Sequence, residues 1–597
     1  MDKEKLNSIR HSCAHLLAAA VMELWPDTKR TIGPAIGDGF YYDFDFGDQK
    51  ISEEDFPKIE AKMAEILKTW AKFEKKEVSV EEAKQFYQDN PYKLELIDEF
   101  SKEGQKITFY KSGNYKQSLK PSQSSGFEDL CKGGHSENPQ KDIGAFKLLS
   151  VAGAYWRGSE KNKMLTRIYG TCFPTQTELD EYLKLQEEAK KKDHRKLGKD
   201  LDLFVFSDVV GKGLPLLTEK GTTIRRELER MVVDEELKRG YLHVITPPLA
   251  KVDLYKISGH YPYYKDTMYP VMKVDDEELI LRPMTCPHHF MLYKSKQRSY
   301  KELPIKYAEI SPQFRYEKSG ELTGLMRVRV FTLSDAHIFT RDTQAKQVIK
   351  DVLDLIDYFN KAFGLKKGKD YRYRLSLGER SDEKKYYKDD EAWEKAENIL
   401  REVLVESKAP FFEAKNEAAF YGPKIDIQLK NVSGKEETAF TVQYDFVMPK
   451  RFDLKYIDEE GKEQQPVVIH RASIGALERT MAFLIEKYGG AFPVWLSPIQ
   501  VMIVPISDQN LKYSQNVLEQ LKDSNIRVQI DDKAETMQAK IRNAQLQKIP
   551  YMLIIGKREE SENKVAVRTR EGKDLGAIDL NEFIQKVKSE IESKSSL

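Results

Sequence analysis

The sequence has few cysteines, no long apolar run and almost no net charge, and each absence narrows what the protein is. Its four cysteines are far apart and form no CxxC pair, which argues against a disulfide-stapled secreted domain and predicts a reducing compartment, the cytoplasm. No apolar stretch reaches the roughly 18 residues of a membrane-spanning helix, so no membrane association is expected. Lysine and arginine number 97 against 96 acidic residues, which neither favours nor excludes RNA, because local basic patches suffice to bind it.

A chain of 597 residues accommodates about four domains, and changes of pattern indicate where they lie. Residues 1–175 mix helical and strand-like segments and predict an α+β domain that starts with a helix over 3–25. Residues 176–204 are strongly charged and predict a solvated linker helix, with contact to RNA phosphates as the alternative. Residues 205–496 have mixed polarity and frequent turns, typical of an antiparallel sheet. Residues 497–597 alternate strands and helices, which predicts an α/β domain with a partly parallel sheet.

One segment, SPQFRYEKSGELTGLMRVRVFTLSDAHIFT at 311–340, is rich in groups that suit a nucleotide. Its first predicted strand ends at Arg315 and Glu317. After a charged loop, the second predicted strand begins with Arg327 and Arg329. Since residues two apart in a strand face the same way, both members of each pair are expected to project together. Guanidinium groups suit phosphates and a carboxylate suits an exocyclic amine. The segment alone leaves a salt-bridged surface hairpin open as the alternative.

Two further segments make a family resemblance close: LILRPMTCPHH at 279–289 and PVVIHRASIGALERTMAFLIEKYG at 466–489. Together with the hairpin they resemble the active-site segments of class II aminoacyl-tRNA synthetases, and among them those of the threonyl-tRNA synthetase family. The hairpin is similar to motif 2 and the last segment to motif 3. The resemblance runs almost from end to end. It implies an α+β editing domain of the bacterial type, a class II catalytic core on an antiparallel sheet, and a carboxy-terminal anticodon-binding domain. It also implies that a small extra domain, carried by many bacterial members ahead of the editing domain, is absent.

The activity that the resemblance implies is ATP-dependent ligation of L-threonine to tRNA(Thr) through a threonyl-adenylate, with Mg²⁺ accompanying ATP. The segment 209–248 resembles motif 1, a helix and strand at a homodimer interface, so a homodimer is expected. DNA is not an expected partner. There are two alternatives: a non-catalytic RNA-binding relative that kept the fold, and a ligase for proline or serine. The retained motif residues argue against both.

Three residues far apart in the sequence, Cys286, His337 and His470, lie where this family carries its zinc ligands. Their spacing alone is a weak signal, but three protein ligands with one open position are the pattern of a catalytic zinc site. Threonine and valine are nearly isosteric, and a site that binds the hydroxyl rejects its absence by roughly 10⁴–10⁵-fold. Asp335 is expected to hold the same hydroxyl or the amine.

The resemblance also assigns the groups around ATP. Arg315 is expected to grip the α-phosphate and Glu317 to read the adenine amine, while Arg327 and Arg479 hold the outer phosphates with Mg²⁺. Arg315 and Arg479 count among the catalytic residues. Two further segments complete the pocket. AFYGPK supplies Lys424 as a catalytic residue and Tyr421 as a substrate-binding residue, and TVQYDF supplies Gln443 as a second substrate-binding residue.

Zinc does not separate threonine from serine, which lacks only a methyl group worth about 1–3 kcal/mol, so a second, hydrolytic site is expected. His11 and His15 are four residues apart on a predicted helix and therefore share a face. Cys131 and His135 have the same spacing in DLCKGGH. By count the four groups predict a zinc site. The resemblance instead implies an editing site for seryl-tRNA(Thr) in which they position a hydrolytic water without metal. Both interpretations stay open here.

The sequence departs from the usual family pattern at several positions. Leu333 replaces a glutamine that helps to hold the substrate, and Ala476 replaces a serine of motif 3. In PMTCPHH, His288 and His289 have no assigned role. In the editing motif, an arginine and a proline are replaced by residues expected to loosen the loop, Lys132 and Gly134.

In the last domain, Arg568 and Arg570 alternate on a predicted strand and are expected to face one side and contact anticodon bases. A solvated face is the alternative at these two positions.

Overall fold

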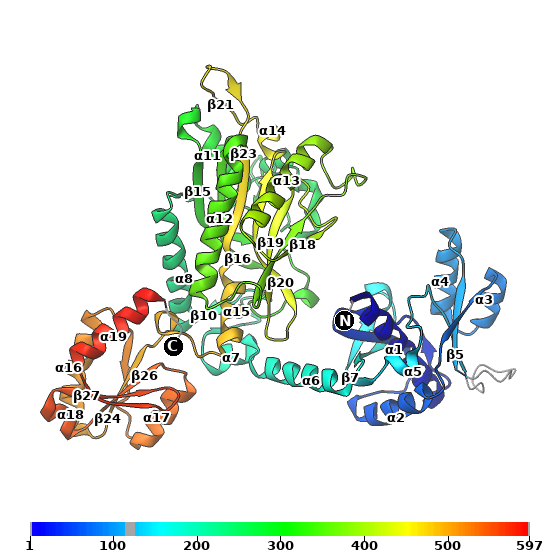
Figure 1. Cartoon of the computed structure of the whole chain (residues 1–597), viewed down its shortest axis with the longest axis horizontal. Helices are drawn as coiled ribbons and strands as arrows, with labels where there is room; N and C mark the ends of the chain where they lie inside the picture. The colour runs from blue at the N-terminus through cyan, green and yellow to red at the C-terminus, as the bar shows by residue number, and fades with distance from the viewer. Residues whose placement is uncertain (1–2, 114–125, 595–597) are drawn as a thin grey trace. The chain divides into compact units, whose positions relative to one another are not determined.

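The computed structural model describes residues 3–113 and 126–594, and the chain divides into two compact units, Met1–Gln186 and Glu187–Leu597 (Figure 1). Among the described residues, every helix is too short or too polar to cross a bilayer. Each unit has its own apolar core, so each is described by itself.

The first unit is built on a long helix, α1 (Lys3–Leu24), that packs on an antiparallel sheet. Its buried face carries alanine and leucine, including Leu16 and Leu17, against Phe40 and Phe44 of the sheet. The strands of this sheet, in spatial order, are β1 (Lys29–Arg30), β3 (Gly39–Asp45), β8 (Met164–Phe173) and β7 (Ala145–Tyr155), with β2 (Ala35–Ile36) on β3. The helix predicted over 3–25 is confirmed, and Pro26 follows its end because proline cannot continue a helix.

A second, smaller sheet in this unit positions the loop that follows β6. Its strands are β4 (Phe73–Glu77), β5 (Thr108–Gly113) and β6 (Gly126–Leu130), all antiparallel. The remaining helices of the unit are α2 (Phe56–Leu67), α3 (Val80–Phe86), α4 (Pro91–Lys102) and α5 (Pro139–Asp142). Cys131 comes directly after β6, so strand pairing fixes where its side chain lies.

The segment predicted as one linker helix forms two helices, α6 (Gln176–Lys191) and α7 (His194–Asp200). The break comes at Asp193, whose extended backbone and side-chain hydrogen bond to the Arg195 N–H cap α7. Aspartate is a preferred residue at such a cap because its carboxylate accepts an otherwise unpaired helix N–H.

The second unit contains an eight-stranded sheet that is antiparallel except at its two edges, as predicted. In spatial order its strands are β11 (Leu242–His243), β15 (Ile305–Phe314), β16 (Val330–Thr340), β23 (Val467–Ala476), β20 (Glu436–Asp445), β19 (Lys424–Lys430), β17 (Tyr371–Ser376) and β18 (Phe411–Ala414). Strand geometry alternates the two faces: Ala336 and Ile338 point into the apolar core, whereas Asp335 and His337 point to the other face.

Helices bury the apolar face of this sheet and leave the other face for a cavity. The helices of this layer are α8 (Glu219–Lys238), α12 (Asp342–Ala362), α13 (Asp390–Glu406) and α15 (Leu477–Tyr488). Figure 1 shows α12 running along β16 and β23. On the cavity side, α11 (Cys286–Lys294) starts with Cys286.

The last part of the chain has a five-stranded sheet in which β24 (Val501–Pro505) runs parallel to both neighbours. The other strands are β25 (Val528–Ile530), β26 (Tyr551–Ile555), β27 (Lys564–Thr569) and β28 (Asp574–Asp579), the last two antiparallel. Helices α16 (Leu511–Asp523) and α19 (Leu580–Ser593) pack in one apolar cluster and α17 (Met537–Leu546) in another. The partly parallel α/β arrangement predicted here is confirmed.

Gly475 makes possible an irregularity in β23 that directs the chain into α15. Pairing with β16 slips between Leu333 and Asp335, and Gly475 has φ +65° with the Ala439 carbonyl oxygen only 2.3 Å from where a Cβ would stand. We expect Gly475→Ala to lower the free energy of unfolding by roughly 1–3 kcal/mol from backbone strain, with the clash added to it. Chemical denaturation measures the change.

Gly461 provides the matched control, because it also has a positive φ (+77°) but no atom within 4 Å of the position that a Cβ would occupy. Gly461→Ala should cost only the strain of about 1 kcal/mol. Equal losses in the two variants would show that the close approach to Ala439 is unimportant.

Candidate functional sites

The open face of the eight-stranded sheet holds a cavity of about 630 Å³. It brings together residues from β15, β16, β19, β20, β23, α11 and α15 that are far apart in the sequence. Every residue predicted above for zinc, ATP or amino acid lines it: Cys286, Arg315, Glu317, Arg327, Asp335, His337, Tyr421, Lys424, Gln443, His470 and Arg479.

Cys286, His337 and His470 meet at the floor of this cavity. His337 and His470 are directly opposite each other on β16 and β23, and Cys286 is the first residue of α11. One donor atom from each lies within 4.8 Å of the others, and all three side chains are buried. The register of the strands therefore brings together three residues whose spacing in the sequence was only a weak sign of a metal site.

The chemistry of these three donors fits a divalent metal ion. Burial raises the pKa of the Cys286 thiol well above its ordinary value and lowers the pKa of His337. Neutral imidazole is the form that binds metal, and a bound cation stabilises the thiolate that burial alone disfavours. One thiol and two imidazoles, with the cavity as an open side, are a donor set that zinc prefers.

Outer contacts orient both imidazoles and leave one nitrogen of each ring unused. His337 Nδ1 lies 2.9 Å from His289 Nδ1, and His470 Nε2 lies 2.7 Å from Asp445 Oδ2. His289 in turn lies 3.2 Å from Glu309 Oε2. Such partners set ring orientation in metal sites. From the sequence, His289 had no assigned role and Asp445 was not singled out. Asp445 is two residues after Gln443 and therefore on the same strand face, which could have marked it as a neighbour of the site.

The hairpin differs from its prediction in one respect. β15 ends at Phe314 and β16 begins at Val330, so the four charged residues lie in the connection rather than on the strands. Arg327 faces the cavity, but Arg329 does not: its guanidinium lies 4.9 Å above the Tyr316 ring, and its Nε donates to the Glu317 carbonyl. The expectation that the two arginines project together is wrong, because the alternation of strand side chains does not hold in this loop.

The cationic groups of the cavity are held by backbone and carboxylate oxygens. Arg327 lies 2.7 Å from Glu317 and 3.1 Å from Glu321, and Arg479 Nε donates to the Met326 carbonyl at 3.2 Å. These contacts keep the guanidinium groups of the loop and of α15 near each other at the cavity wall.

Beside the three metal-binding candidates, polar side chains form a short network. The Tyr421 hydroxyl donates to Gln443 Oε1 at 2.5 Å, and the Tyr421 ring stacks on His470 at 5.2 Å. Gln313 Nε2 lies 3.4 Å from Asp335 Oδ2. Burial raises the pKa of Asp335. Gln313 was not predicted from the sequence; it places an amide next to Asp335, in a cavity where Leu333 offers none.

Lys424 is held by the buried carboxylate of Asp426, whose Oδ2 lies 3.1 Å from its Nζ. Asp426 also accepts from Arg374 and Ser376 at 2.8 Å each. His288, in contrast, is buried outside the cavity lining.

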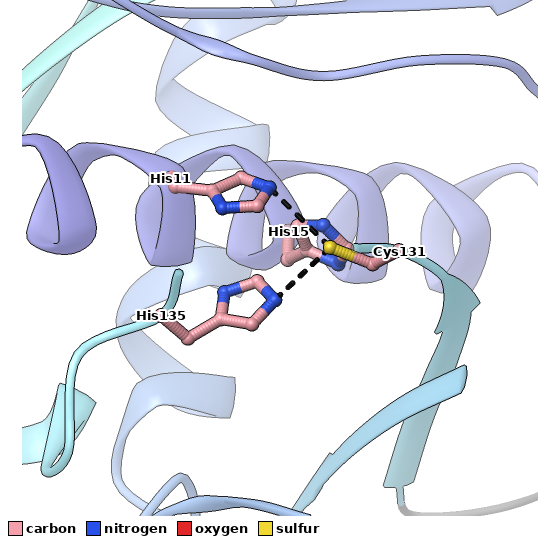
Figure 2. A group of neighbouring side chains, drawn as sticks. All are labelled: His11, His15, Cys131 and His135. Carbon is pink, nitrogen blue, oxygen red and sulfur yellow. Dashed lines mark hydrogen bonds between the residues drawn. The ribbon is translucent and has the colours of Figure 1, made fainter. Parts of the chain in front are cut away.

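A second cluster lies in the first unit, where His11, His15, Cys131 and His135 converge as predicted (Figure 2). The two histidines of α1 are one turn apart, and Cys131 and His135 come from the loop after β6. Cys131 Sγ lies 3.6 Å from His11 Nε2 and 3.3 Å from His135 Nε2. The His11 and His135 rings stack at 4.3 Å.

A fully buried carboxylate, Asp129, anchors the wall behind this cluster. Lys93 Nζ and Arg30 Nε lie 2.8 and 3.1 Å from Oδ1, and the Tyr42 hydroxyl donates to Oδ2 at 2.5 Å. Burial by itself raises the pKa of Asp129, but Lys93 and Arg30 outweigh it and hold the pKa below its ordinary range. Asp129 was only a minor candidate from sequence, and nothing local in the sequence links it to Lys93 or Arg30.

The cluster is neutral at neutral pH. Burial lowers the pKa of His15 to about 3, lowers the pKa of His11 and His135, and raises the pKa of Cys131 to about 11. Neutral imidazoles accept hydrogen bonds, so the arrangement suits holding a water molecule.

The two arginines expected to share a face in the last part of the chain differ in environment. Arg568 is on β27 and its side chain is 36% exposed, 3.5 Å from Asp574. Arg570 lies past the end of β27, is 10% exposed, and donates to the Phe492 carbonyl at 2.6 Å. The strand alternation assumed for them therefore does not extend to Arg570.

Three parts of the chain match known protein families. Residues 269–488 match the family described as tRNA synthetase class II core domain (G, H, P, S and T). Residues 500–590 match the anticodon binding domain family, and residues 107–169 match the threonyl and alanyl tRNA synthetase second additional domain.

Individual relatives are similar over nearly the whole chain. The threonine–tRNA ligase of Staphylococcus carnosus is 50% identical over 593 residues, which cover 99% of this chain and 89% of the relative. That of Geobacillus sp. is 50% identical over 591 residues, 98% of this chain and 89% of the relative. A crystal structure described as the RNA binding domain of threonyl-tRNA synthetase from Cryptosporidium parvum is 35% identical with a TM-score of 0.63, covering 67% of this chain and 98% of that one.

The buried histidines make the first unit sensitive to acid. Above a pH of about 6.5, His15 is uncharged in both the folded and the unfolded state. Below that pH the imidazole of the unfolded state binds a proton, whereas the imidazole of the folded state stays neutral down to a pH of about 3. The unfolded state then holds more protons, so stability falls as the pH falls. From this residue alone we expect a loss of about 2 kcal/mol between about pH 7 and pH 5.

Pulse proteolysis in urea, scored on fragments of the first unit, measures this loss. His15→Gln cannot titrate and should show a shallower pH dependence. An identical slope in both proteins would contradict the assignment.

Proposed function

This chain belongs to the threonyl-tRNA synthetase family of class II, the threonine–tRNA ligases, and we propose on this basis that it activates L-threonine as a threonyl-adenylate and removes mischarged serine in its first unit. The observation that carries the proposal is the cavity in which three metal-binding donors adjoin the predicted ATP-binding groups. The alternative of a ligase for proline or serine does not call for those three donors.

Threonine recognition is assigned to the floor of the cavity. Cys286, His337 and His470 would hold Zn²⁺, which supplies, when bound, a Lewis-acidic position for the amine and hydroxyl of threonine. Asp335 and Tyr421 stand beside them as acceptor and donor for the same groups. Valine lacks the hydroxyl and would leave these buried polar groups unpaired, which disfavours it by roughly 10⁴–10⁵-fold.

Adenylate formation then needs positioning and charge stabilisation. A carboxylate oxygen of threonine bonds to the α-phosphorus of ATP as the bond to pyrophosphate breaks. Arg315 and Lys424 are placed to stabilise the charge on the α-phosphate, and Arg327 and Arg479 to hold the outer phosphates with Mg²⁺. Glu317 is the proposed acceptor for the adenine amine. Arg327 is held by Glu317, and Arg479 by the Met326 carbonyl next to Arg327. These contacts keep the two guanidinium groups near each other, which supports a shared phosphate site.

Serine removal is assigned to the cluster of Figure 2. We favour the metal-free route over zinc because the family resemblance implies it. The neutral thiol and imidazoles would also suit a metal ion, so they do not separate the two routes. A neutral imidazole of His11, His15 or His135 would hold the water that attacks the ester of seryl-tRNA(Thr) and relay its proton to the leaving ribose oxygen, so that serine and the free tRNA are released.

The predicted domains enter this proposal as an editing domain (1–175), a linker (176–204), a catalytic domain (205–496) and an anticodon-binding domain (497–597). Arg568, the more exposed of the two arginines above, is the better-placed base contact. A homodimer is supported by exposed apolar side chains on and after α8, Leu237, Leu242 and Ile245 at 53%, 54% and 96%. The cytoplasm, where translation takes place, is the proposed location.

Cys286→Ala tests the metal centre. We expect the zinc content of the purified protein to fall to background and threonine-dependent ATP–pyrophosphate exchange to be lost, along with the preference of about 10⁴–10⁵ over valine. Cys172→Ala removes another buried thiol, in the first unit, and should keep both zinc and activity. A metal-free Cys286→Ala enzyme that activates threonine normally would refute the assignment.

The editing proposal is tested by a double variant, His11→Ala with Cys131→Ala. Seryl-tRNA(Thr) should accumulate, with deacylation slowed by about 10²–10⁴-fold, the usual size of lost acid–base assistance. Threonine activation should not change. Cys13→Ala, on α1 but in the apolar core, is the control and should deacylate normally. Undiminished deacylation by the double variant would contradict the assignment of this site. Loss of deacylation when the wild-type enzyme is treated with a chelator would contradict the metal-free route.

A further inference from the structure

A histidine outside both proposed sites bridges two segments that carry ATP-binding groups. His194 is the first residue of α7 and its side chain is 2% exposed. Its Nδ1 lies 2.7 Å from Glu486 Oε1 on α15, and its Nε2 accepts from the Leu325 N–H of the hairpin loop at 3.1 Å. The neutral tautomer with its proton on Nδ1 satisfies both contacts, since the carboxylate accepts and the amide donates.

The two partners of His194 lead directly to the phosphate-binding groups. Leu325 is followed by Met326, whose carbonyl accepts from Arg479, and by Arg327. Glu486 lies seven residues after Arg479 on α15, two turns along the same helix face. The imidazole therefore fastens the loop that carries Arg327 to the helix that carries Arg479.

The loop backbone fits closely against this imidazole. Gly324 has φ +47°, and a Cβ there would lie 2.2 Å from His194 Nε2 and 2.7 Å from Arg195 Cγ. Only glycine permits this approach. At the last residue of the loop, the Arg329 N–H donates to the Gly213 carbonyl at 2.8 Å. The second half of the loop is thus held by the chain between α6 and α8.

The cluster of Asp193, His194 and Glu486 has three groups that suit a metal by type. Both imidazole nitrogens are, however, engaged in hydrogen bonds of good length, so neither is left to bind an ion. The geometry favours a structural link over a metal site.

We propose that His194 is a positioning residue for ATP: by joining Leu325 of the loop to Glu486 of α15, it sets the spacing of Arg327 and Arg479 around the outer phosphates. The inference rests on the ATP site proposed above. Under this proposal α7 contributes to ATP binding through His194. It does not contribute to threonine binding, because no contact of His194 described above leads to the metal-binding donors.

The test is the split between the two substrates in ATP–pyrophosphate exchange by the full-length enzyme. For His194→Ala we expect KM for ATP to rise about tenfold, the effect of losing roughly one buried hydrogen bond. KM for threonine, zinc content and seryl-tRNA(Thr) deacylation should stay at their wild-type values. A merely structural role would instead lower the active fraction or raise both KM values together.

Two conservative variants separate the two contacts. His194→Gln places an amide oxygen near the Nε2 position and should restore most of the ATP affinity. His194→Asn mimics only Nδ1, keeps the donor to Glu486 and should not restore it. Gly324→Ala pushes the loop away from His194 and leaves the histidine itself intact, so it should raise KM for ATP as His194→Ala does. This variant keeps the test available if His194→Ala does not fold. Lys196→Ala changes an exposed side chain of the same helix and should leave KM for ATP unchanged.

The outcomes separate this inference from the proposed function. If the wild-type enzyme shows no threonine-dependent exchange, the proposed function is wrong. If it does, and folded His194→Ala or Gly324→Ala keeps KM for ATP within about twofold of wild type, the positioning role is wrong. Parallel rises in both KM values, or rescue by asparagine rather than glutamine, would also overturn it.

Discussion

The pairing of β16 with β23 is the constraint on which the cavity of the eight-stranded sheet depends. It sets His337 opposite His470, and the next pairing, of β23 with β20, sets His470 opposite Gln443. Because side chains alternate with a period of two, a slip of one residue would turn His337 into the apolar core and expose Ile338. The same hydrophobic pattern that buries the helical face of the sheet therefore fixes the geometry of the polar face.

Burial then decides the chemistry of the two cysteine and histidine clusters. In both, burial raises the pKa of the thiol, and it lowers the pKa of His337 in one cluster and of His15 in the other, which favours the uncharged forms of these groups. The surroundings differ. The cluster in the cavity has Asp445 on His470 and His289 on His337, contacts that orient the imidazoles. The cluster in the first unit has Asp129, already saturated by Lys93 and Arg30, behind it. One chain thus places similar side chains in environments suited to different tasks.

The loop between β15 and β16 shows how a segment without strand pairing gains precision from its neighbours. Its arginines cannot rely on the ladder, which ends at Phe314. Backbone contacts to His194, Arg479 and Gly213 replace it. Contacts of this kind hold a loop in place, which catalysis by positioning requires.

The family, the order of the domains, the antiparallel core and the partly parallel last sheet could all be predicted from the amino-acid sequence, because they follow from hydrophobic period and from motifs that are local. The sequence also nominated the eleven predicted residues that line the cavity, through resemblance, and the four residues of the cluster in the first unit, through their spacing and through resemblance. Features that depend on contacts between distant segments needed the folded chain: the outer partners His289 and Asp445, the Lys93 and Arg30 pair on Asp129, the amide of Gln313, and the link from His194 to Leu325. The fold also moved Arg329 and Arg570 off the strands assumed for them, since strand ends are set by pairing partners and not by the alternation of residues along one segment.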